Sequence, residues 1–230
     1  MATQGYGQFC PVAKAAEVLT ERWTPLLLRE LLGGSRRFNE LRRGVPLMSP
    51  TLLAGRLQRL ERSGVIRRIR PPGARHWEYH LTEAGEECRP LIDLMGAWGQ
   101  RWALGRVTRE ELDPALVMWF VLRKVQAQRE RLPAERVVVL FDVTDAGKGK
   151  RYWWLVLDRP TVDLCLSDPG FAVDLTWRSR VRPIATVLLG ELALDDAQRS
   201  RAIALEGPPG LRRSVPGWLG FEPAPDKTAR

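Results

Sequence analysis

The sequence predicts an α+β protein of two domains, a helical half followed by a half that mixes strands and helices. Its 230 residues exceed one average domain and fall short of three. Apolar residues recur at helical spacing through the first half, whereas the alternation typical of strands begins near Arg136. A polar stretch at residues 106–112 separates the two patterns. We therefore expect domains at residues 1–105 and 106–230.

Composition and cysteine content exclude several classes of protein. Hydrophobic residues make up 44% and charged residues 27% of the chain, and no run of about 18 apolar residues could span a bilayer. The start MATQGYGQF lacks the basic end and apolar stretch of a signal peptide, so we expect a cytoplasmic protein. Cys10, Cys88 and Cys165 are widely spaced, and only two histidines accompany them. We expect no disulfide framework, no metal site and no cofactor.

Helix-start and helix-stop residues divide the first half into short elements. Helices are expected at residues 10–23, 24–34 and 35–44, the third capped by Ser35. After a turn at residues 45–48, the next helix has Ser49 as its N-cap and Pro50 as its first residue, and it ends at Gly64. Strands at 65–70 and 76–81 around the turn sequence PPGA form a hairpin, and a helix capped by Thr82 covers 82–104.

The second half alternates strands with apolar helices. A strongly apolar helix is expected to begin at Pro114. Four strands follow at residues 136–145, 150–159, 161–168 and 171–179. Residues 184–207 are predicted to form helices, or a helix and a short strand.

Positive charge is concentrated in one part of the chain. Between Arg29 and Arg75 there are twelve arginines, no lysine and three acids, an excess equal to the net charge of +9 for the whole protein. Such a basic face could meet nucleic acid, an acidic protein or an anionic membrane, or could simply be solvated.

The helix that begins at Pro50 places this charge on one side. Leu53, Leu57 and Leu60 share a face at helical spacing and are expected to face the core. The opposite face then carries Thr51, Gly55, Gln58, Arg59 and Arg62. A glycine inside a helix costs about 1 kcal/mol relative to alanine, so Gly55 either tolerates that cost or lets another surface come close.

Helix, turn, helix and hairpin together favour binding to DNA. This order of elements can place one helix in a major groove while the hairpin reaches neighbouring phosphates. Arginine suits that task because its planar guanidinium binds phosphates or guanine edges through paired hydrogen bonds.

Four stretches stand out between Cys10 and about Leu104: CPVAKAAEVL, RWTPLLLRELLGGSRRFNELRRGVP, MSPTLLAGRLQRLERSGVIRR and EYHLTEAGEECRPLIDLMGAW. In this order and spacing they resemble the HxlR-type (MarR-like) winged-helix transcription regulators. The resemblance implies a winged helix-turn-helix domain for DNA binding and dimerisation. It also implies a homodimer that binds a twofold-symmetric operator in double-stranded DNA, with half-sites about one helical turn apart.

The resemblance also assigns site residues. Arg37 matches a phosphate contact, and the groove helix and wing positions are Ser49, Thr51, Arg56, Arg59, Arg70, Arg75 and His76. The first helix and the helix after the wing are implied as the dimer surface, through Leu91, Leu94, Met95, Trp98 and Trp102. Apolar residues at this spacing are also typical of a plain core.

Cys10 has two interpretations. Some relatives in the resembled family use an N-terminal cysteine in this Cys-Pro context to sense oxidants or electrophiles. The alternative is a small buried apolar residue at the start of a helix.

The last hundred residues contain DLTWR, LLGEL, LEG before a Pro-Gly loop, and a closing PGWLG. These pieces resemble the sterol carrier protein fold, an α/β sandwich around an apolar pocket. We therefore expect an effector-binding domain for an apolar small molecule, lined by Trp119, Phe120, Trp153, Trp177 and Trp218. The same aromatics could simply fill a core.

Two other classes of protein compete with this interpretation. An enzyme is disfavoured because the chain has no Gly-x-Ser-x-Gly elbow, phosphate-binding glycine loop or metal cluster, and GKGKR at residues 147–151 reads as a hairpin turn. A carrier of lipid or another hydrophobic ligand whose basic half meets membranes is the second rival, although we expect no membrane partner.

Overall fold

The computed structural model describes residues 5–103, 108, 112–159 and 161–221. The chain forms two compact units, an N-terminal unit, Met1–Gly105, and a C-terminal unit, Arg106–Arg230. Among the described residues, no helix combines the length and the apolar composition needed to cross a bilayer.

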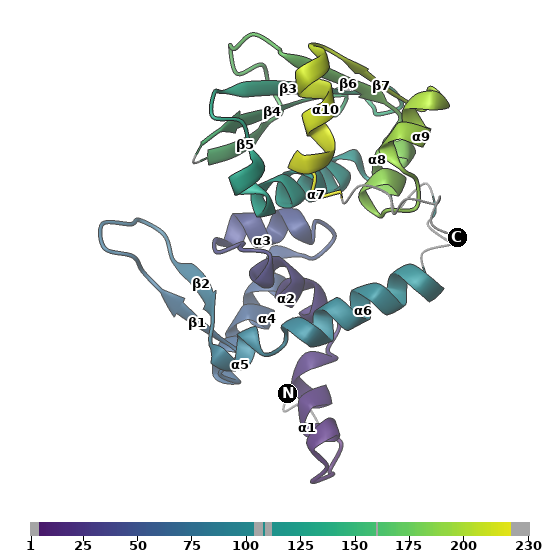
Figure 1. Ribbon diagram of the computed structural model, residues 1–230. Helices are drawn as coiled ribbons and strands as arrows, with labels where there is room; N and C mark the ends of the chain where they lie inside the picture. Colours follow the sequence, from purple (N-terminus) through teal and green to yellow (C-terminus); the bar gives the residue numbers. More distant parts are fainter. Residues whose placement is uncertain (1–4, 104–107, 109–111, 160, 222–230) are drawn as a thin grey trace. The chain divides into compact units, whose positions relative to one another are not determined.

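The N-terminal unit is a helical bundle from which a two-stranded hairpin projects (Figure 1). Its helices are α1 (Pro11–Leu19), α2 (Thr24–Leu32), α3 (Phe38–Gly44), α4 (Pro50–Arg62), α5 (Glu83–Glu86) and α6 (Arg89–Trp102). Strands β1 (Ile66–Ile69) and β2 (Glu78–Leu81) pair antiparallel, with Ile66 opposite Leu81. The core lies between α2, α3 and α4, and the predicted core residues Leu53, Leu57 and Leu60 are buried there.

Two local predictions for this unit are wrong. Ser35 does not cap α3: it is buried and donates to the Glu30 carboxylate at 3.4 Å, while α3 begins at Phe38. Glu40 satisfies the start of α3 instead, because its carboxylate accepts from the backbone N–H groups of Arg36 and Arg37 at 2.8 and 3.0 Å. The predicted helix at 82–104 is interrupted after α5, since a proline early in α6 cannot continue the hydrogen bonding of a preceding turn.

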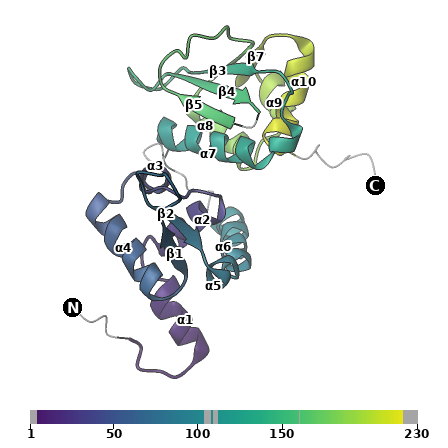
Figure 2. The same ribbon diagram turned by 90° about the vertical axis from the view of Figure 1, so that its left-hand side faces the viewer.

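The C-terminal unit is a five-stranded mixed sheet with helices packed on one face (Figures 1 and 2). The strands are β3 (Val137–Val143), β4 (Tyr152–Asp158), β5 (Thr161–Cys165), β6 (Leu175–Ser179) and β7 (Ile203–Glu206). They lie in the order β5-β4-β3-β6-β7, and only β3 and β6 pair in parallel. The helical elements are α7 (Pro114–Ala127), η2 (Arg129–Arg131), α8 (Val181–Leu188), α9 (Leu194–Arg199) and α10 (Pro209–Trp218).

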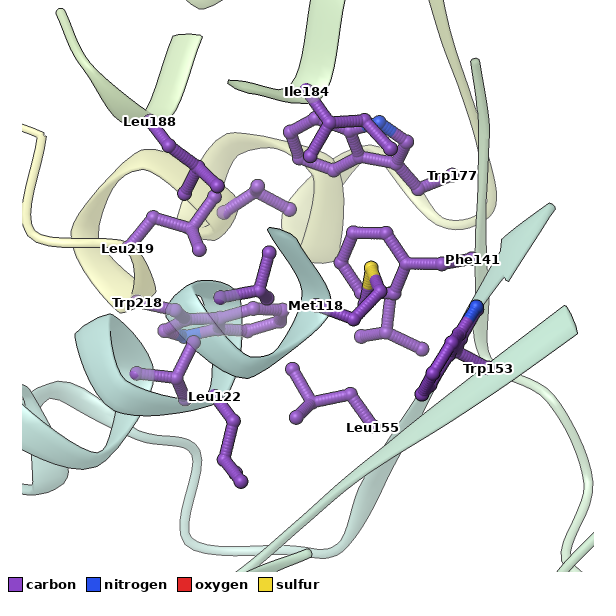
Figure 3. Packing of buried hydrophobic residues seen from close by; sticks show 14 of the residues in the cluster. Met118, Leu122, Phe141, Trp153, Leu155, Trp177, Ile184, Leu188, Trp218 and Leu219 are labelled. Atoms are coloured by element: carbon purple, nitrogen blue, oxygen red, sulfur yellow. The ribbon is translucent and has the colours of Figure 1, made fainter. Parts of the chain in front are cut away.

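The space between the sheet and its helices is filled by large apolar side chains (Figure 3). Met118 and Leu122 of α7 and Trp218 of α10 point toward Phe141 and Leu155 of the sheet. Phe141 and Trp177 stack with ring centroids 5.3 Å apart, an arrangement that adds to the burial of both rings. The buried aromatic residues Trp119, Phe141, Trp153, Trp177 and Trp218 therefore fill a core.

Helix α10 was not predicted from the sequence, where its residues read as a Pro-Gly loop. Two glycines and an internal proline, Pro216, make this segment a poor helix by propensity. The helix forms because Val215 and Trp218 lie on one side of it and are buried against the sheet. Tertiary packing thus overrides the local preference.

A buried carboxylate on β3 ties two strands together. Asp142 accepts from Arg151 Nε at 2.6 Å and from Arg178 Nε at 3.2 Å, and it is 4% exposed. The hydrogen bond from Arg151 is the main cause that lowers the pKa of Asp142, and burial opposes it. A carboxyl group with a lowered pKa in the folded state stabilises the fold above its ordinary pKa of about 3.9. That contribution is lost as the pH falls through the lowered value.

We expect Asp142→Asn to lower the free energy of unfolding at pH 7 and to have a smaller effect at pH 3, where the wild-type carboxyl group begins to lose its own contribution. Urea unfolding at the two pH values measures this difference. Asp163→Asn is the matched control, because Asp163 is exposed on β5. An equal loss of stability at both pH values would show that the charge of Asp142 is not what matters.

Candidate nucleic-acid interface

Helix α4 presents a polar face for local reasons. Ser49 precedes its first turn, and its Oγ accepts from the backbone N–H of Leu52 at 3.3 Å, as expected for an N-cap. Pro50 occupies the first helical position. Because the leucines face the core, Thr51 is exposed on the first turn, and Gly55 is exposed one turn later.

Arg56 is not on this exposed face, so the prediction that it reaches the groove is wrong. It is only 9% exposed, and its Nη1 pairs with Glu21. Arg56 follows Leu53 by three residues and precedes Leu60 by four, which puts it on the core side of the helix. Burial is the main cause that lowers the pKa of Arg56, and the charge of Arg59 adds to it.

Arg59 lies at the edge of the same face and remains accessible. Its side chain is 43% exposed, and its Nη1 donates to the other carboxylate oxygen of Glu21. Glu21 belongs to the short connection between α1 and α2, more than thirty residues earlier in the chain. The two arginines are therefore held from outside their own helix.

A second cluster joins the start of α3 to the hairpin. Arg37 is exposed immediately before α3, and its Nε lies 3.9 Å from Oε1 of Glu78 on β2. His76 Nε2 lies 3.9 Å from the same oxygen, while His80 Nε2 lies 3.0 Å from Glu78 Oε2. The structure thus brings Arg37 and His76 together around one carboxylate.

The tip of the hairpin is held by its own side chains. Arg70 Nε donates to the carbonyl of Ala74 at 3.0 Å, which closes the loop, and Arg75 beside it is exposed. The guanidinium of Arg68 lies over the ring of Trp77, 4.6 Å from its centroid, and Trp77 is 46% exposed. A cation stacked on an aromatic ring restricts both side chains. Trp77 was not among the predicted site residues.

Two of the three acids between Arg29 and Arg75 interact with groups of the fold itself. Glu30 is 3% exposed and accepts from Arg29 Nη2 at 2.8 Å, and Glu40 caps α3 through the contacts described above. The exposed arginines of the segment are Arg37, Arg42, Arg43, Arg62, Arg67, Arg68, Arg70 and Arg75. The surface of α3, α4 and the hairpin is therefore strongly positive.

An apolar hollow lies elsewhere on the same unit, between α1 and α6. The hollow has a volume of about 560 Å³. Neither α1 nor α6 contains a buried residue in its described part. Figures 1 and 2 show α1 extending away from the rest of the bundle. All five predicted dimer residues are exposed: Leu91 50%, Leu94 68%, Met95 55%, Trp98 62% and Trp102 70%. Four of them, all but Trp102, line the hollow.

The cysteines have different surroundings. Cys10 is partly exposed at the N-terminus of α1, and its side chain makes no capping hydrogen bond. Cys88 is buried, and burial is the main cause that raises the pKa of its thiol. Within the described ranges, no three His, Cys, Asp or Glu side chains gather in a way that could hold a metal ion.

The predicted ligand-binding residues do not surround an open pocket. Trp177 and Trp218 line a cavity of about 10 Å³ between the sheet, α7 and α10. Trp119 and Trp153 are buried elsewhere in the same core, and Trp153 Nε1 donates to the carbonyl of Lys150 at 2.7 Å. Phe120 is partly buried against that core. The cavity is about the size of one water molecule, whereas sites for small ligands enclose roughly 300–1,000 Å³.

Comparison with known proteins agrees with the architecture of the N-terminal unit. The model of the HxlR-like helix-turn-helix family matches residues 18–106. YvaP, an uncharacterized HTH-type transcriptional regulator of Bacillus subtilis, is 35% identical over 97 residues, which cover 41% of this chain and 90% of YvaP. The chain belongs to the HxlR-like helix-turn-helix family. A second uncharacterized HTH-type regulator of the same bacterium, YdeP, is 37% identical over 97 residues, or 40% of this chain and 73% of YdeP.

Solved structures similar to this HxlR-like protein include two regulators. The redox regulator HypR in its reduced form is 31% identical, with a TM-score of 0.39 over 43% of this chain and 100% of that one. The reduced form of the transcriptional regulator YodB from Bacillus subtilis is 29% identical, with a TM-score of 0.38 over 44% of this chain and 100% of YodB. The HxlR-like family and the curated relatives are transcription regulators and not enzymes, so this chain is a helix-turn-helix transcription regulator.

Three residues of this HxlR-like regulator were missed from the sequence: Glu21, Trp77 and Glu78. Glu21 reaches α4 across more than thirty residues, and no spacing pattern connects them. Trp77 and Glu78 directly follow His76. An aromatic residue beside basic residues is the sequence signal that could have indicated Trp77 as a site residue.

Proposed function

We propose that this regulator acts as a cytoplasmic homodimer that binds a twofold-symmetric operator, with one winged-helix unit on each half-site. The observation that carries the proposal is the exposed basic surface of α3, α4 and the hairpin, on which arginines outnumber the available acids. A positive surface of this kind attracts phosphates, and a helix with a polar outer face fits a major groove about 12 Å wide.

Each predicted contact has a distinct task in this proposal. Ser49 and Thr51 lie at the start of α4, and Arg59 follows two turns later, so these three are assigned to base edges or nearby phosphates. Arg37 is assigned to a phosphate at the start of α3. Arg70, Arg75 and His76 are assigned to the sugar–phosphate backbone of the DNA beside the hairpin. Arg56 is excluded because it is buried.

The apolar hollow between α1 and α6 is the proposed dimer surface. Large apolar side chains exposed side by side mark an interaction surface, and a second copy offers the same helices in return. A dimer made through α1 and α6 would place two α4 helices on one duplex, which a twofold-symmetric operator requires.

Selection of duplexes from a random pool by the full-length protein tests the proposal. We expect enrichment of an inverted repeat whose half-sites are centred about 10 base pairs apart, with binding that weakens steeply as salt rises. Sedimentation with anionic liposomes is the second arm. Enrichment of no sequence, together with sedimentation of the protein, would instead favour a basic unit that meets membranes.

Gly55 gives a sharper test of where the duplex lies. A Cβ at this position would meet no atom of the chain within 4 Å, so Gly55→Ala should stabilise α4 by about 1 kcal/mol. We expect the same variant to bind the selected duplex more weakly, because an added methyl group separates α4 from the groove floor. Thermal unfolding and a binding titration measure the two effects. Unchanged affinity would show that DNA does not approach Gly55.

We further propose that the C-terminal unit is a sterol carrier protein-like domain that responds to an apolar small molecule. Its mixed sheet is covered by helices, and apolar side chains fill the space between them, which supports this assignment. Because the cavity is about 10 Å³, a ligand must displace part of the core. We expect helix α10 to move, since it supplies Val215 and Trp218 to the lining, is followed directly by Leu219, and contains an internal proline.

Titration with the apolar fluorophore 1-anilinonaphthalene-8-sulfonate tests this second proposal. We expect saturable binding that alters tryptophan fluorescence and changes the affinity for the selected duplex, because an effector must bind the DNA-competent and incompetent states differently. Binding without any change in DNA affinity would reduce the C-terminal unit to a module without a regulatory role.

A further inference from the structure

A cluster of three charged side chains, Glu21, Arg56 and Arg59, connects the α1–α2 link to helix α4. Glu21 lies in the link, and its two carboxylate oxygens pair with the Nη1 atoms of Arg56 and Arg59. Exposure of the side chain rises along the series, from 10% for Arg56 through 27% for Glu21 to 43% for Arg59. The three charged side chains therefore extend from the core side of α4 to its surface.

Arg56 anchors the inner end. Its Nε is buried and has no hydrogen-bond partner among the residues that the structure describes, and its Nη1 is paired with Glu21, which compensates its charge. Burying a charge without a partner is strongly unfavourable, so the ion pair with Arg56 favours holding the Glu21 carboxylate in place. The backbone of the link is also fixed, because Glu21 O accepts from Thr24 N–H at 2.9 Å and Trp23 adopts a left-handed φ of 80°.

Arg59 is the outer end, and one edge of its guanidinium is held. Only its Nη1 contacts Glu21, which leaves the rest of the planar group at the surface. A long side chain that is ordered before binding loses less conformational entropy when it meets its target. Because Glu21 holds one edge of the Arg59 guanidinium, another edge is oriented to donate paired hydrogen bonds to a base.

We propose that Glu21 is a positioning residue for sequence recognition: it orients Arg59 toward a base edge in the duplex and does not itself touch DNA. This inference rests on the proposed DNA-binding function. It assigns a role in discrimination to an acid on the α1–α2 link, outside the helix-turn-helix surface.

Removing the charge of Glu21 has two effects of opposite sign. The protein gains one unit of positive charge, which strengthens attraction to phosphates whatever the sequence. Arg59 loses its orientation, which weakens the preference for the correct base. The ratio of the affinities for specific and scrambled duplexes therefore separates positioning from simple attraction.

The experiment compares full-length wild type with Glu21→Gln, Arg59→Ala and the double variant. The probes are the duplex that the wild type enriches and a scrambled duplex of equal length and composition. We expect Glu21→Gln to bind the scrambled duplex at least as well as wild type, and to lower the ratio of the two affinities about tenfold. Arg59→Ala should lower the ratio similarly, and the double variant no further, because the two residues act through one contact.

Glu61→Gln is the matched control. It removes one negative charge from α4 itself, and Glu61 makes no ion pair with Arg56 or Arg59. We expect it to leave the ratio unchanged. Should Glu21→Gln lower the melting temperature, the double variant Glu21→Gln/Arg56→Met removes the unpaired buried charge, and its ratio should still fall.

The inference is overturned if Glu21→Gln, or the repaired variant with Arg56→Met, keeps the wild-type ratio, or if the effects of Glu21→Gln and Arg59→Ala add. A wild-type protein that prefers no duplex would overturn the proposed function and this inference with it. A preference that persists without Glu21 overturns the inference alone.

Discussion

Replacing Trp98 with glutamate is expected to convert the protein into a monomer and to weaken binding to the selected duplex by about a hundredfold. Trp98 is 62% exposed on α6 and lines the apolar hollow with residues of α1. A carboxylate there would be buried without a partner in the dimer, which strongly opposes association. The large effect on DNA follows because the second half-site would lose the gain in effective concentration that linkage to the first provides.

Sedimentation velocity and a binding titration on the same samples measure this prediction. Leu166→Glu is the matched control, because Leu166 is 59% exposed in the C-terminal unit and the change of charge is the same. We expect that variant to remain a dimer with wild-type affinity. A Trp98→Glu protein that stays dimeric would place the dimer contact on another surface.

Replacing Gly85 with alanine is expected to destabilise the N-terminal unit by about 3 kcal/mol. A Cβ at Gly85 would lie 2.2 Å from the carbonyl oxygen of Val65 and 2.8 Å from Leu81 Cδ2. The first of these is backbone and cannot rotate away. To make room, α5 would have to separate from the start of the hairpin, which breaks the hydrogen bond from Thr82 N–H to Val65 O at 3.1 Å.

Differential scanning calorimetry tests this effect, with an expected decrease in melting temperature of roughly 15 °C for a unit of this size. Hydrogen exchange should show the loss of protection in α5 and the hairpin. Gly55→Ala is the control for adding a methyl group to a helical glycine, because its surroundings are open. If Gly85→Ala melts like wild type, the close approach of α5 to Val65 is not a feature of the folded protein.

Much of the N-terminal unit follows from local patterns. The leucine spacing of α4 predicted its buried face, and Ser49 and Pro50 predicted its start, because helix faces and caps depend on residues within one or two turns. The same leucine spacing leaves Arg56 off the outward face, and only the resemblance to the family assigned it to the groove. The pattern of the hairpin likewise follows from its strand residues and turn sequence.

Contacts between distant residues were beyond such patterns. Glu40 displaced Ser35 as the cap of α3, and helix α10 formed against its own propensities because Val215 and Trp218 are buried on the sheet. The aromatics of the second half suggested a pocket, but their packing leaves a cavity of about 10 Å³. How well side chains interlock depends on the whole core, and composition does not specify it.

The sequence by itself determined the order of helix, turn, helix and hairpin in the N-terminal unit, the basic character of that segment and the apolar character of α6. Each of these depends on residue type and short-range spacing. Only the tertiary structure decided which arginines remain accessible and which acid holds them. Glu21 meets Arg56 and Arg59 because the chain folds back over more than thirty residues, and ion pairs at that separation depend on three-dimensional position.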